Sequence, residues 1–373
     1  MKKISKAHKL KCKFSRMTKK KLFRIIKLSL INLFVILLLL VLIDPILGMI
    51  SDEKEGLSRN INFKENTPNS SLIIGNDETD RNKKPNFKNT DQNGFILGPN
   101  ETSTNEIDFI FLGSSTVENE NVREVNRYPF LSIKNLNQEL GTNYISRNAG
   151  VGGNLLSASN LILTSKIIPL KPQYVVLSSS LIDMLYLSKN RSYWDGSKRY
   201  LIEEKAANSL LKNIKDTFFP NLWLQIRKFR LNSNISDFQK KDFSPEDQER
   251  ILNQYRRQLE VFINTCLIYN ITPILSTDYY VPELVKRNLI KKGIFNSHEA
   301  NYYVETLIPE LNLLINSKAE EYDLSIIKLH ERVELNNSFV NKEDGIHLTD
   351  EGSQKVSEVI SNFLLRKIQH EEI

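Results

Sequence analysis

Short apolar runs alternate with longer amphipathic stretches from about residue 105 to the C-terminus. Apolar runs bounded by turn residues are typical of strands that are buried on both faces of a parallel sheet. In the stretches between them, apolar residues recur every three or four positions, as on one face of a helix. We therefore predict five strands, at residues 107–112, 144–146, 173–179, 271–277 and 324–329.

The predicted helices lie between and after these strands. They cover residues 127–140, 154–168, 246–268 and 298–318, and a last helix follows Thr349. Thr349 is a suitable N-cap, and Pro309 should start or kink the helix that contains it. Strands that alternate with helices predict an α/β fold, here a three-layer α/β/α sandwich with a mainly parallel five-stranded sheet. In such sheets, functional loops follow the carboxyl ends of the strands.

The first 50 residues have a different character. Residues 1–27 hold twelve Lys or Arg and no acidic residue, and residues 28–50 carry one charge, Asp44. About 20 apolar residues span a bilayer as a helix, and the positive-inside rule puts the N-terminus in the cytoplasm and the rest outside. A cleaved signal peptide is the alternative. No A-x-A-like triplet lies near Asp44–Ser51, so we favour a retained signal anchor and expect a single-pass membrane protein with an extracytoplasmic C-terminal domain.

Beyond the predicted anchor, residues 51–104 are polar and are expected to form a linker. The α/β domain is expected at 105–370, with a mostly helical insert near 184–244. Within the insert, the segment Phe218–Arg230 mixes aromatic and basic residues at helical spacing. It is expected to be a packing helix, a cap over the functional site, or a helix that rests on a membrane surface.

Charge and cysteine content exclude two classes of protein. The chain carries a net charge of +7, and removing the twelve basic residues of the tail leaves −5. We therefore expect no nucleic-acid partner for the body of the protein. Cys12 and Cys266 would lie on opposite sides of the membrane. Neither a disulfide framework nor a Cys-rich metal site is expected.

Polar blocks follow the predicted strands. They are "GSST" (113–116) after the first strand, "NAGVGGN" (148–154) after the second, "SSSLID" (178–183) after the third and "DGIH" (344–347) after the fifth. A serine hydroxyl is a weak nucleophile, so a histidine must take its proton and a carboxylate must orient the imidazole. Among the five histidines, His347 alone has a nearby acid, Asp344, in a glycine-containing turn. His330, which follows the fifth strand, is the only rival.

These blocks, in this order, resemble the SGNH/GDSL hydrolase superfamily, and the resemblance covers about 105–368. In that family the blocks read G-D-S, N-x-G-x-x-G, G-x-N-D and D-x-x-H. The resemblance implies that Ser115 is the nucleophile, His347 the base and Asp344 the acid that orients it. It also implies that the backbone N–H groups of Gly153 and Ser115 form the oxyanion hole.

This chain departs from the family pattern at two positions. Ser114 stands where the first block has Asp, and Ile182 stands where the third block has Asn. That asparagine supplies a side-chain N–H to the oxyanion hole, and loss of one such donor typically costs on the order of 100–1000-fold in rate. Ser180 and Asn154 are the candidate substitute donors. Asp183 is expected to be structural.

The expected function is that of a serine esterase, O-acyltransferase or deacylase that acts on acyl esters, with an envelope glycan or a lipid as partner. No metal or organic cofactor is implied. The alternative is a catalytically inactive SGNH-fold protein that binds or supports components of the cell envelope, which the missing asparagine favours. A membrane-tethered scaffold that works through its basic tail is a third class.

Overall fold

The computed structural model describes residues 21–36 except 22 and 25, 61–74 except 63, 86–178 except 105, 181–190, 192–194, 203–204 and 247–371. The chain divides into two compact units, Met1–Arg59 and Asn60–Ile373. Most of the insert, including the segment Phe218–Arg230, lies outside the described residues.

In the first unit, the described residues between 21 and 36 are helical. They include only the first part of the predicted span at 28–50. Among the residues that the structure describes, no helix is both long enough and apolar enough to cross a bilayer. The rest of the predicted span lies outside the described residues, so the membrane anchor stays a prediction.

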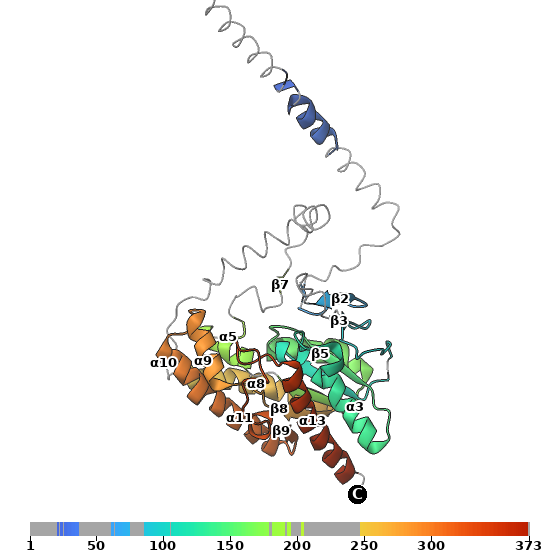
Figure 1. The fold of residues 1–373 in the computed structure, drawn as a ribbon, viewed down its shortest axis with the longest axis vertical. Coiled ribbons are helices and arrows are strands. Elements are labelled where there is room, and N and C mark those ends of the chain that lie inside the picture. Colours follow the sequence, from blue (N-terminus) through green and yellow to red (C-terminus); the bar gives the residue numbers. More distant parts are fainter. Residues whose placement is uncertain are drawn as a thin grey trace, which may run out of the picture. The chain divides into compact units, whose positions relative to one another are not determined.

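A five-stranded, fully parallel sheet forms the centre of the second unit (Figure 1), as the apolar runs predict. Its strand order is β5-β4-β6-β8-β9. The strands are β4 (Phe109–Gly113), β5 (Ser146–Gly150), β6 (Tyr174–Ser178), β8 (Thr272–Ser276) and β9 (Ser325–Ile327). Gly113 pairs with Gly150 on one side and with Ser178 on the other. The carboxyl ends of β4, β5 and β6, which precede the first three polar blocks, therefore lie at the same level of the sheet.

Helices cover both faces of the sheet. They are α2 (Ser115–Glu118), α3 (Tyr128–Leu140), α4 (Leu156–Ile162), α5 (Leu181–Lys189), α8 (Asp247–Ile268), α9 (Pro282–Lys291), α10 (Ser297–Tyr302), α11 (Ile308–Glu321), α12 (Leu329–Arg332) and α13 (Asp350–Glu371). Short 3-10 turns lie at Glu124–Asn126 and Ile168–Leu170.

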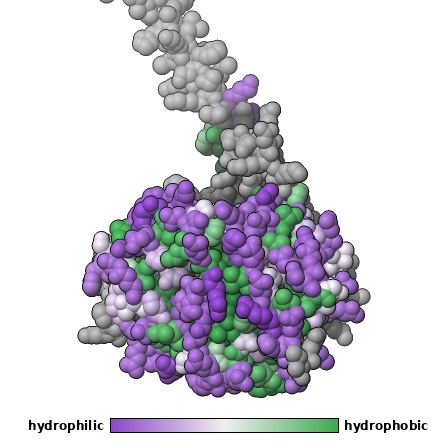
Figure 2. Space-filling view, turned by 60° about the horizontal axis from the view of Figure 1, so that its bottom comes forward, coloured by the Kyte–Doolittle hydropathy of each residue, from purple (hydrophilic) through white to green (hydrophobic). Residues whose placement is uncertain are grey.

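Alternate residues of β4, β6, β8 and β9 supply two separate cores, as expected for a sheet buried on both sides. Phe109 and Phe111 face a core that includes α3 and α13, which lie side by side (Figure 1). Ile110 and Leu112 face the other core, which α4, α5, α8 and α11 complete. The face of the unit drawn in Figure 2 is mostly hydrophilic, with smaller hydrophobic areas between. The structure thus has the three layers that the sequence predicts.

The helix predicted at 298–318 is divided by a π-helical turn at Tyr303–Leu307, between α10 and α11. Pro309 occupies the first turn of α11, directly after the π-helical turn, a position where proline is tolerated. The expectation that Pro309 starts or kinks this helix is confirmed. The expected cap of the last helix is also present, since the Gly352 N–H donates to Thr349 Oγ1 over 3.2 Å.

The second strand differs from its prediction at 144–146, because β5 covers Ser146–Gly150 and is polar. Its buried polar side chains Arg147 and Asn148 have partners within the protein. Arg147 donates to Glu101 over 2.8 Å, and the Asn148 side chain donates to Val117 O over 2.8 Å. These hydrogen bonds offset the cost of burying polar side chains in β5. Their partners lie in other segments of the chain, so the apolar periodicity of the sequence does not predict them.

The second unit also begins earlier than the sequence predicts. In the expected linker, β2 (Ser71–Ile74) pairs antiparallel with β3 (Asn86–Asn89), and Phe95 and Ile96 are each 2% exposed. Ile96 exchanges two backbone hydrogen bonds with Asn148 of β5, of 2.8 and 3.2 Å. These side chains and backbone groups pack on the α/β domain, so part of the segment 51–104 belongs to it. A two-residue pair, β1 (Ile61–Asn62) with β7 (Glu203–Glu204), joins this segment to the insert.

Candidate active site

The candidate nucleophile, Ser115, begins α2 directly after β4. β4 ends at Gly113, where an added Cβ would lie 1.9 Å from Ser178 O of β6, so only glycine fits between β4 and β6, and the chain bends at Ser114. Ser115 is partly exposed. The turn therefore presents its hydroxyl at the carboxyl edge of the sheet, as the sequence predicts.

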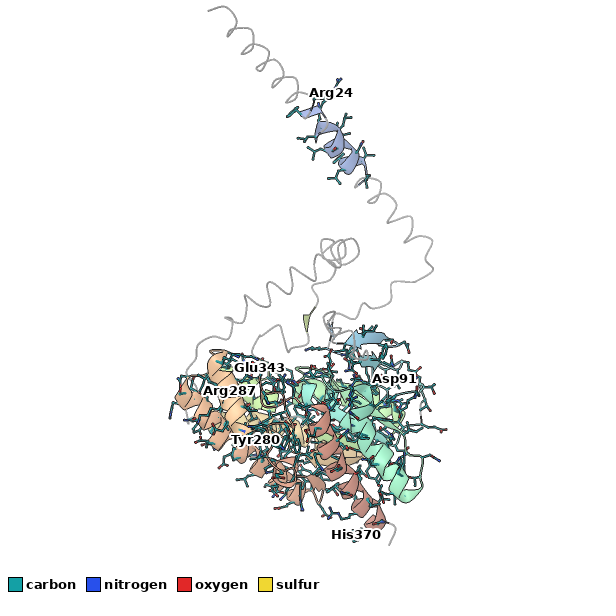
Figure 3. All side chains as sticks on the ribbon, in the orientation of Figure 1. Arg24, Asp91, Tyr280, Arg287, Glu343 and His370 are labelled. Carbon is teal, nitrogen blue, oxygen red and sulfur yellow. The ribbon has the colours of Figure 1, made fainter. Side chains whose placement is uncertain are left out.

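Asp344 and His347 lie in a turn that is fixed to α9. The Val281 N–H donates to Gly345 O over 2.8 Å. Gly345 has φ +75°, and an added Cβ there would lie 2.6 Å from Leu284 Cβ. The labelled residues Arg287 and Glu343 lie on this side of the unit (Figure 3), and Arg287 donates to Lys342 O over 2.7 Å. The turn is thus held by backbone and side-chain contacts on its helix side.

The structure brings Ser115, His347 and Asp344 together in one hydrogen-bonded chain. Ser115 Oγ lies 2.8 Å from His347 Nε2, and His347 Nδ1 lies 2.9 Å from Asp344 Oδ2. Asp344 Oδ1 accepts from the backbone N–H groups of Ile346 at 2.8 Å and His347 at 3.0 Å. Ser115 and His347 are 232 residues apart in the sequence. Together with Asp344 they have the geometry of a nucleophile, a base and an orienting acid.

The surroundings of Asp344 keep its carboxyl ionised. Burial raises the pKa of this carboxyl, but the hydrogen bonds from the His347 ring and from the N–H groups of Ile346 and His347 outweigh burial and lower the pKa below its ordinary value. An ionised Asp344 can hold the Nδ1–H tautomer of His347, which leaves Nε2 free to accept the serine proton.

The glycine-rich block lies directly beside the nucleophile. An added Cβ on Gly150 would lie 2.2 Å from the backbone nitrogen of Glu118 in α2, and one on Gly152 would lie 3.8 Å from Ser115 Cβ. Gly153 follows with φ +75°, a backbone conformation that glycine adopts without strain. We call residues 150–154 the glycine loop. The predicted oxyanion donor, Gly153, is therefore part of a loop that contacts the serine-bearing helix.

Of the two candidate substitute donors, Ser180 and Asn154, only Asn154 lies in the described residues, and its side chain has a partner outside the oxyanion hole. Asn154 is buried and its Nδ2 donates to Lys64 O over 3.2 Å, and Ser180 lies outside the described residues. Ile182 lies in the first turn of α5, where it packs against the apolar core. Asp183 is structural, as expected: its Oδ1 accepts from the Leu156 N–H over 2.8 Å and from another buried side chain.

Sequence reasoning missed a buried acid at this edge, Asp278, which is 3% exposed. Its Oδ1 accepts from Ser178 Oγ over 2.7 Å and from Thr116 Oγ1 over 3.4 Å, and its Oδ2 accepts from the Leu181 N–H over 3.2 Å. Asp278 therefore connects the helix of Ser115 to the third block. Its position directly after the predicted strand at 271–277 was the available indication.

The rival histidine is not part of the chain of hydrogen bonds. His330 Nδ1 lies 2.8 Å from Thr277 Oγ1, and its Nε2 lies 3.6 Å from Glu331. Burial of the ring lowers the pKa of His330 below its ordinary value, although Glu331 acts in the opposite direction. His347 is thus the histidine that the structure places against Ser115.

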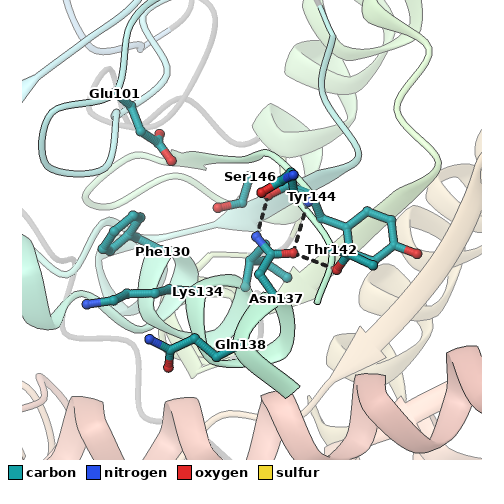
Figure 4. A pocket seen from close by; sticks show the side chains of 10 residues that line it. Glu101, Phe130, Lys134, Asn137, Gln138, Thr142, Tyr144 and Ser146 are labelled. Carbon is teal, nitrogen blue, oxygen red and sulfur yellow. Dashed lines mark hydrogen bonds between the residues drawn. The ribbon is translucent and has the colours of Figure 1, made fainter. Parts of the chain in front are cut away.

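A pocket of about 330 Å³ lies away from these residues, between α3 and the amino end of β5 (Figure 4). Phe130, Lys134, Gln138 and Tyr144 are among the side chains around it. In the part of the chain that the structure describes, no group of three or more His, Cys, Asp or Glu residues could hold a metal ion.

The fold and this geometry define a three-layer α/β domain with a Ser–His–Asp arrangement at the carboxyl edge of its sheet. No family model matches the chain, and no curated protein matches it.

Solved structures that it is similar to include a GDSL-like lipase from Bacteroides thetaiotaomicron, at 13% identity and a TM-score of 0.40 over 72% of this chain and 93% of that one. A lipase/acylhydrolase from Enterococcus faecalis has 12% identity and a TM-score of 0.41 over 70% and 96%. An acetyl-xylooligosaccharide esterase from Geobacillus has 13% identity and a TM-score of 0.41 over 72% and 95%. Likenesses this distant carry no activity over to this chain.

Proposed function

We propose that this protein is a serine esterase or acyl-transferring enzyme that acts on acyl esters through a seryl-ester intermediate. The observation that supports this proposal is the hydrogen-bonded chain from Ser115 Oγ through His347 to Asp344, with distances of 2.8 and 2.9 Å. Each member has the position that nucleophilic catalysis by serine requires.

In the first half of the reaction, Ser115 Oγ attacks the ester carbonyl carbon while His347 Nε2 takes the hydroxyl proton. Asp344 stabilises the imidazolium that forms. When the tetrahedral intermediate collapses, the bond to the alcohol oxygen breaks and His347 gives its proton to that oxygen. In the second half, His347 takes a proton from water or a sugar hydroxyl, which attacks the acyl carbon, and Ser115 regains its proton when the acyl group leaves.

The oxyanion would be bound by the backbone N–H groups of Gly153 and Ser115. The side chain of Ile182 offers no donor, and one bond of Asn154 Nδ2 goes to Lys64 O. Because one absent donor costs on the order of 100–1000-fold in rate, we expect slow turnover of simple esters.

The proposed substrates are acyl esters at the cell envelope, on glycans or lipids. The support is the basic tail at 1–27 followed by the apolar segment at 28–50, which would anchor the chain and export the domain. Transfer to water would make the protein an esterase, and transfer to or from a sugar hydroxyl would make it an O-acyltransferase or a deacylase.

The test is labelling of the purified full chain with a fluorophosphonate, which reacts with activated serines. We expect wild type to be labelled and the variants Ser115→Ala and His347→Ala not to be. His330→Ala is the matched control, because His330 also contacts a hydroxyl, Thr277 Oγ1 at 2.8 Å, and should leave labelling unchanged. A folded wild-type protein that is not labelled would refute the proposal.

A second candidate is a catalytically inactive protein of this fold that binds an envelope component. The apolar packing of Ile182 favours it, because a binding protein needs no third oxyanion donor. The same experiment distinguishes the two candidates, since an inactive protein should show no labelling that depends on His347.

A further inference from the structure

A short N-terminal segment, Lys64–Thr67, crosses the glycine loop beside the candidate nucleophile. We call this segment the strap. Lys64 Nζ donates to Gly152 O, and Asn66 Nδ2 donates to Gly150 O over 3.1 Å. The loop donates in return, from Asn154 Nδ2 to Lys64 O over 3.2 Å. The strap therefore contacts the glycine loop at its beginning, its middle and its end.

The strap is itself fixed on its other side. Glu65 forms an ion pair with Lys166, and Lys166 Nζ also donates to Asn93 O over 2.6 Å. Thr67 O accepts from Thr90 Oγ1 over 2.6 Å. An added Cβ on Gly94 would lie 2.4 Å from Asn66 O, so the two backbones are in close contact. The strap can therefore support the glycine loop from a defined position.

The bond from Lys64 bears on the candidate oxyanion donor through the geometry of one peptide unit. Gly152 C=O and Gly153 N–H belong to the same planar peptide, and the described chain contains no cis peptide bond. In a trans peptide, C=O and N–H point in opposite directions. A donor that fixes the direction of Gly152 O therefore also fixes the direction of the Gly153 N–H. The Lys64 ammonium also polarises the peptide, because its positive charge lies against Gly152 O, and this strengthens the Gly153 N–H as a donor.

We propose that Lys64 and Asn66 are positioning residues. Lys64 holds the Gly152–Gly153 peptide and Asn66 holds the start of the glycine loop at Gly150 O, so that the Gly153 N–H faces the oxyanion formed at Ser115. This inference rests on the proposed acyl-transfer function and adds a part of the chain to it. Neither side chain needs to touch the substrate, since both act through the carbonyl groups of the glycine loop.

The test uses the full chain with two variants, Lys64→Met, which removes the charge and keeps the length, and Asn66→Asp, which keeps the shape and removes the donor. The readouts are the rate of fluorophosphonate labelling and the hydrolysis of 4-nitrophenyl acetate. We expect kcat and the labelling rate to fall about 10- to 100-fold. This loss lies between the effect of slightly misplacing the Gly153 N–H and the effect of losing one oxyanion donor completely. KM should stay near its wild-type value, because the oxyanion is absent from the bound ester and forms only in the transition state and the tetrahedral intermediate.

Two controls match these changes away from the site. Lys355→Met removes an exposed lysine that pairs with Glu358 over 2.8 Å. Asn264→Asp removes an amide that donates to Glu260 O over 2.8 Å. Both should keep the wild-type labelling rate.

Affinity for an alkylboronic acid separates positioning from stability. Such an acid forms a tetrahedral adduct with an active serine, so its affinity should fall by the same factor as kcat/KM in the strap variants. If the strap were only structural, the variants would melt earlier but the folded protein would keep both kcat and boronic acid affinity. That result, with wild type labelled, would overturn this inference alone. A wild type that is not labelled would instead overturn the proposed function, and with it the inference.

Discussion

Substitution of Gly150 by Ala tests whether the glycine loop must lie against the serine-bearing helix. The added Cβ would lie 2.2 Å from the backbone nitrogen of Glu118, whereas ordinary contact begins near 3.4 Å. The two segments would therefore have to separate by about 1.2 Å, the difference between these distances. Overpacking of this kind costs about 1–3 kcal/mol of stability. A misplacement of about 1 Å in a catalytic group can cost on the order of 100-fold in rate.

The assay is the fluorophosphonate labelling rate of folded Gly150→Ala, together with its melting temperature. Gly141→Ala is the matched control: Gly141 has φ +67° with no atom within 4 Å of an added Cβ, so alanine there costs about 1 kcal/mol of backbone strain and moves nothing near Ser115. We expect both variants to be destabilised and only Gly150→Ala to be labelled about 100-fold more slowly. Labelling of Gly150→Ala at the wild-type rate would refute the reasoning that this contact sets the site.

Further predictions concern charge and burial. Lys88→Met should lower the free energy of unfolding, measured in urea, by about 3–5 kcal/mol, because the buried carboxylate of Glu118, which pairs with Lys88 over 2.8 Å, loses its cation. Adding Glu118→Gln should restore much of the lost stability, and a failure to do so would contradict this explanation. The pKa of Asp344 is lowered in the folded protein, so its ionised form stabilises the fold above about pH 4, the ordinary value. The melting-temperature gap between wild type and Asp344→Asn should therefore close as pH falls below about 4, and a gap constant from pH 6 to 3 would show that ionisation is not its cause. Burial raises the pKa of Cys266 to about 12, so in a Cys12→Ser protein iodoacetamide at pH 8 should label Cys266 only after denaturation.

The sequence predicted those strands and helices whose own residues show the apolar pattern of a buried element. The runs at 107–112 and 173–179 are apolar because both faces of β4 and β6 are buried. The Ser115, Asp344 and His347 arrangement was also predictable, since each residue follows a strand and the carboxyl ends of parallel strands meet at one edge. Their catalytic role stays a prediction until labelling is measured.

The sequence could not predict features that depend on partners far along the chain. β5 is polar, and Arg147 is buried in it because Glu101 pairs with it. The strap is a run of polar residues, so Lys64 and Asn66 appeared to belong to a linker. Its conformation is fixed by hydrogen bonds to the glycine loop. Asp278 is buried because the hydroxyls of Thr116 and Ser178 and the backbone N–H of Leu181 donate to its carboxylate. In each case the physical cause is a tertiary contact, which residue spacing does not encode.

The position of Ile96 on β5 has a consequence for the behaviour of fragments. β5 is the outermost strand of the sheet on its side, and an open outer strand offers unpaired N–H and C=O groups to other molecules. Ile96 occupies part of that border through its two backbone bonds with Asn148. A fragment that begins at residue 105 would lack Ile96 and Phe95. The edge of β5 would then be unpaired, and the apolar surface that Phe95 covers would be exposed. Copies of such a fragment should therefore aggregate through strand addition, a process that the N-terminal segment hinders in the full chain.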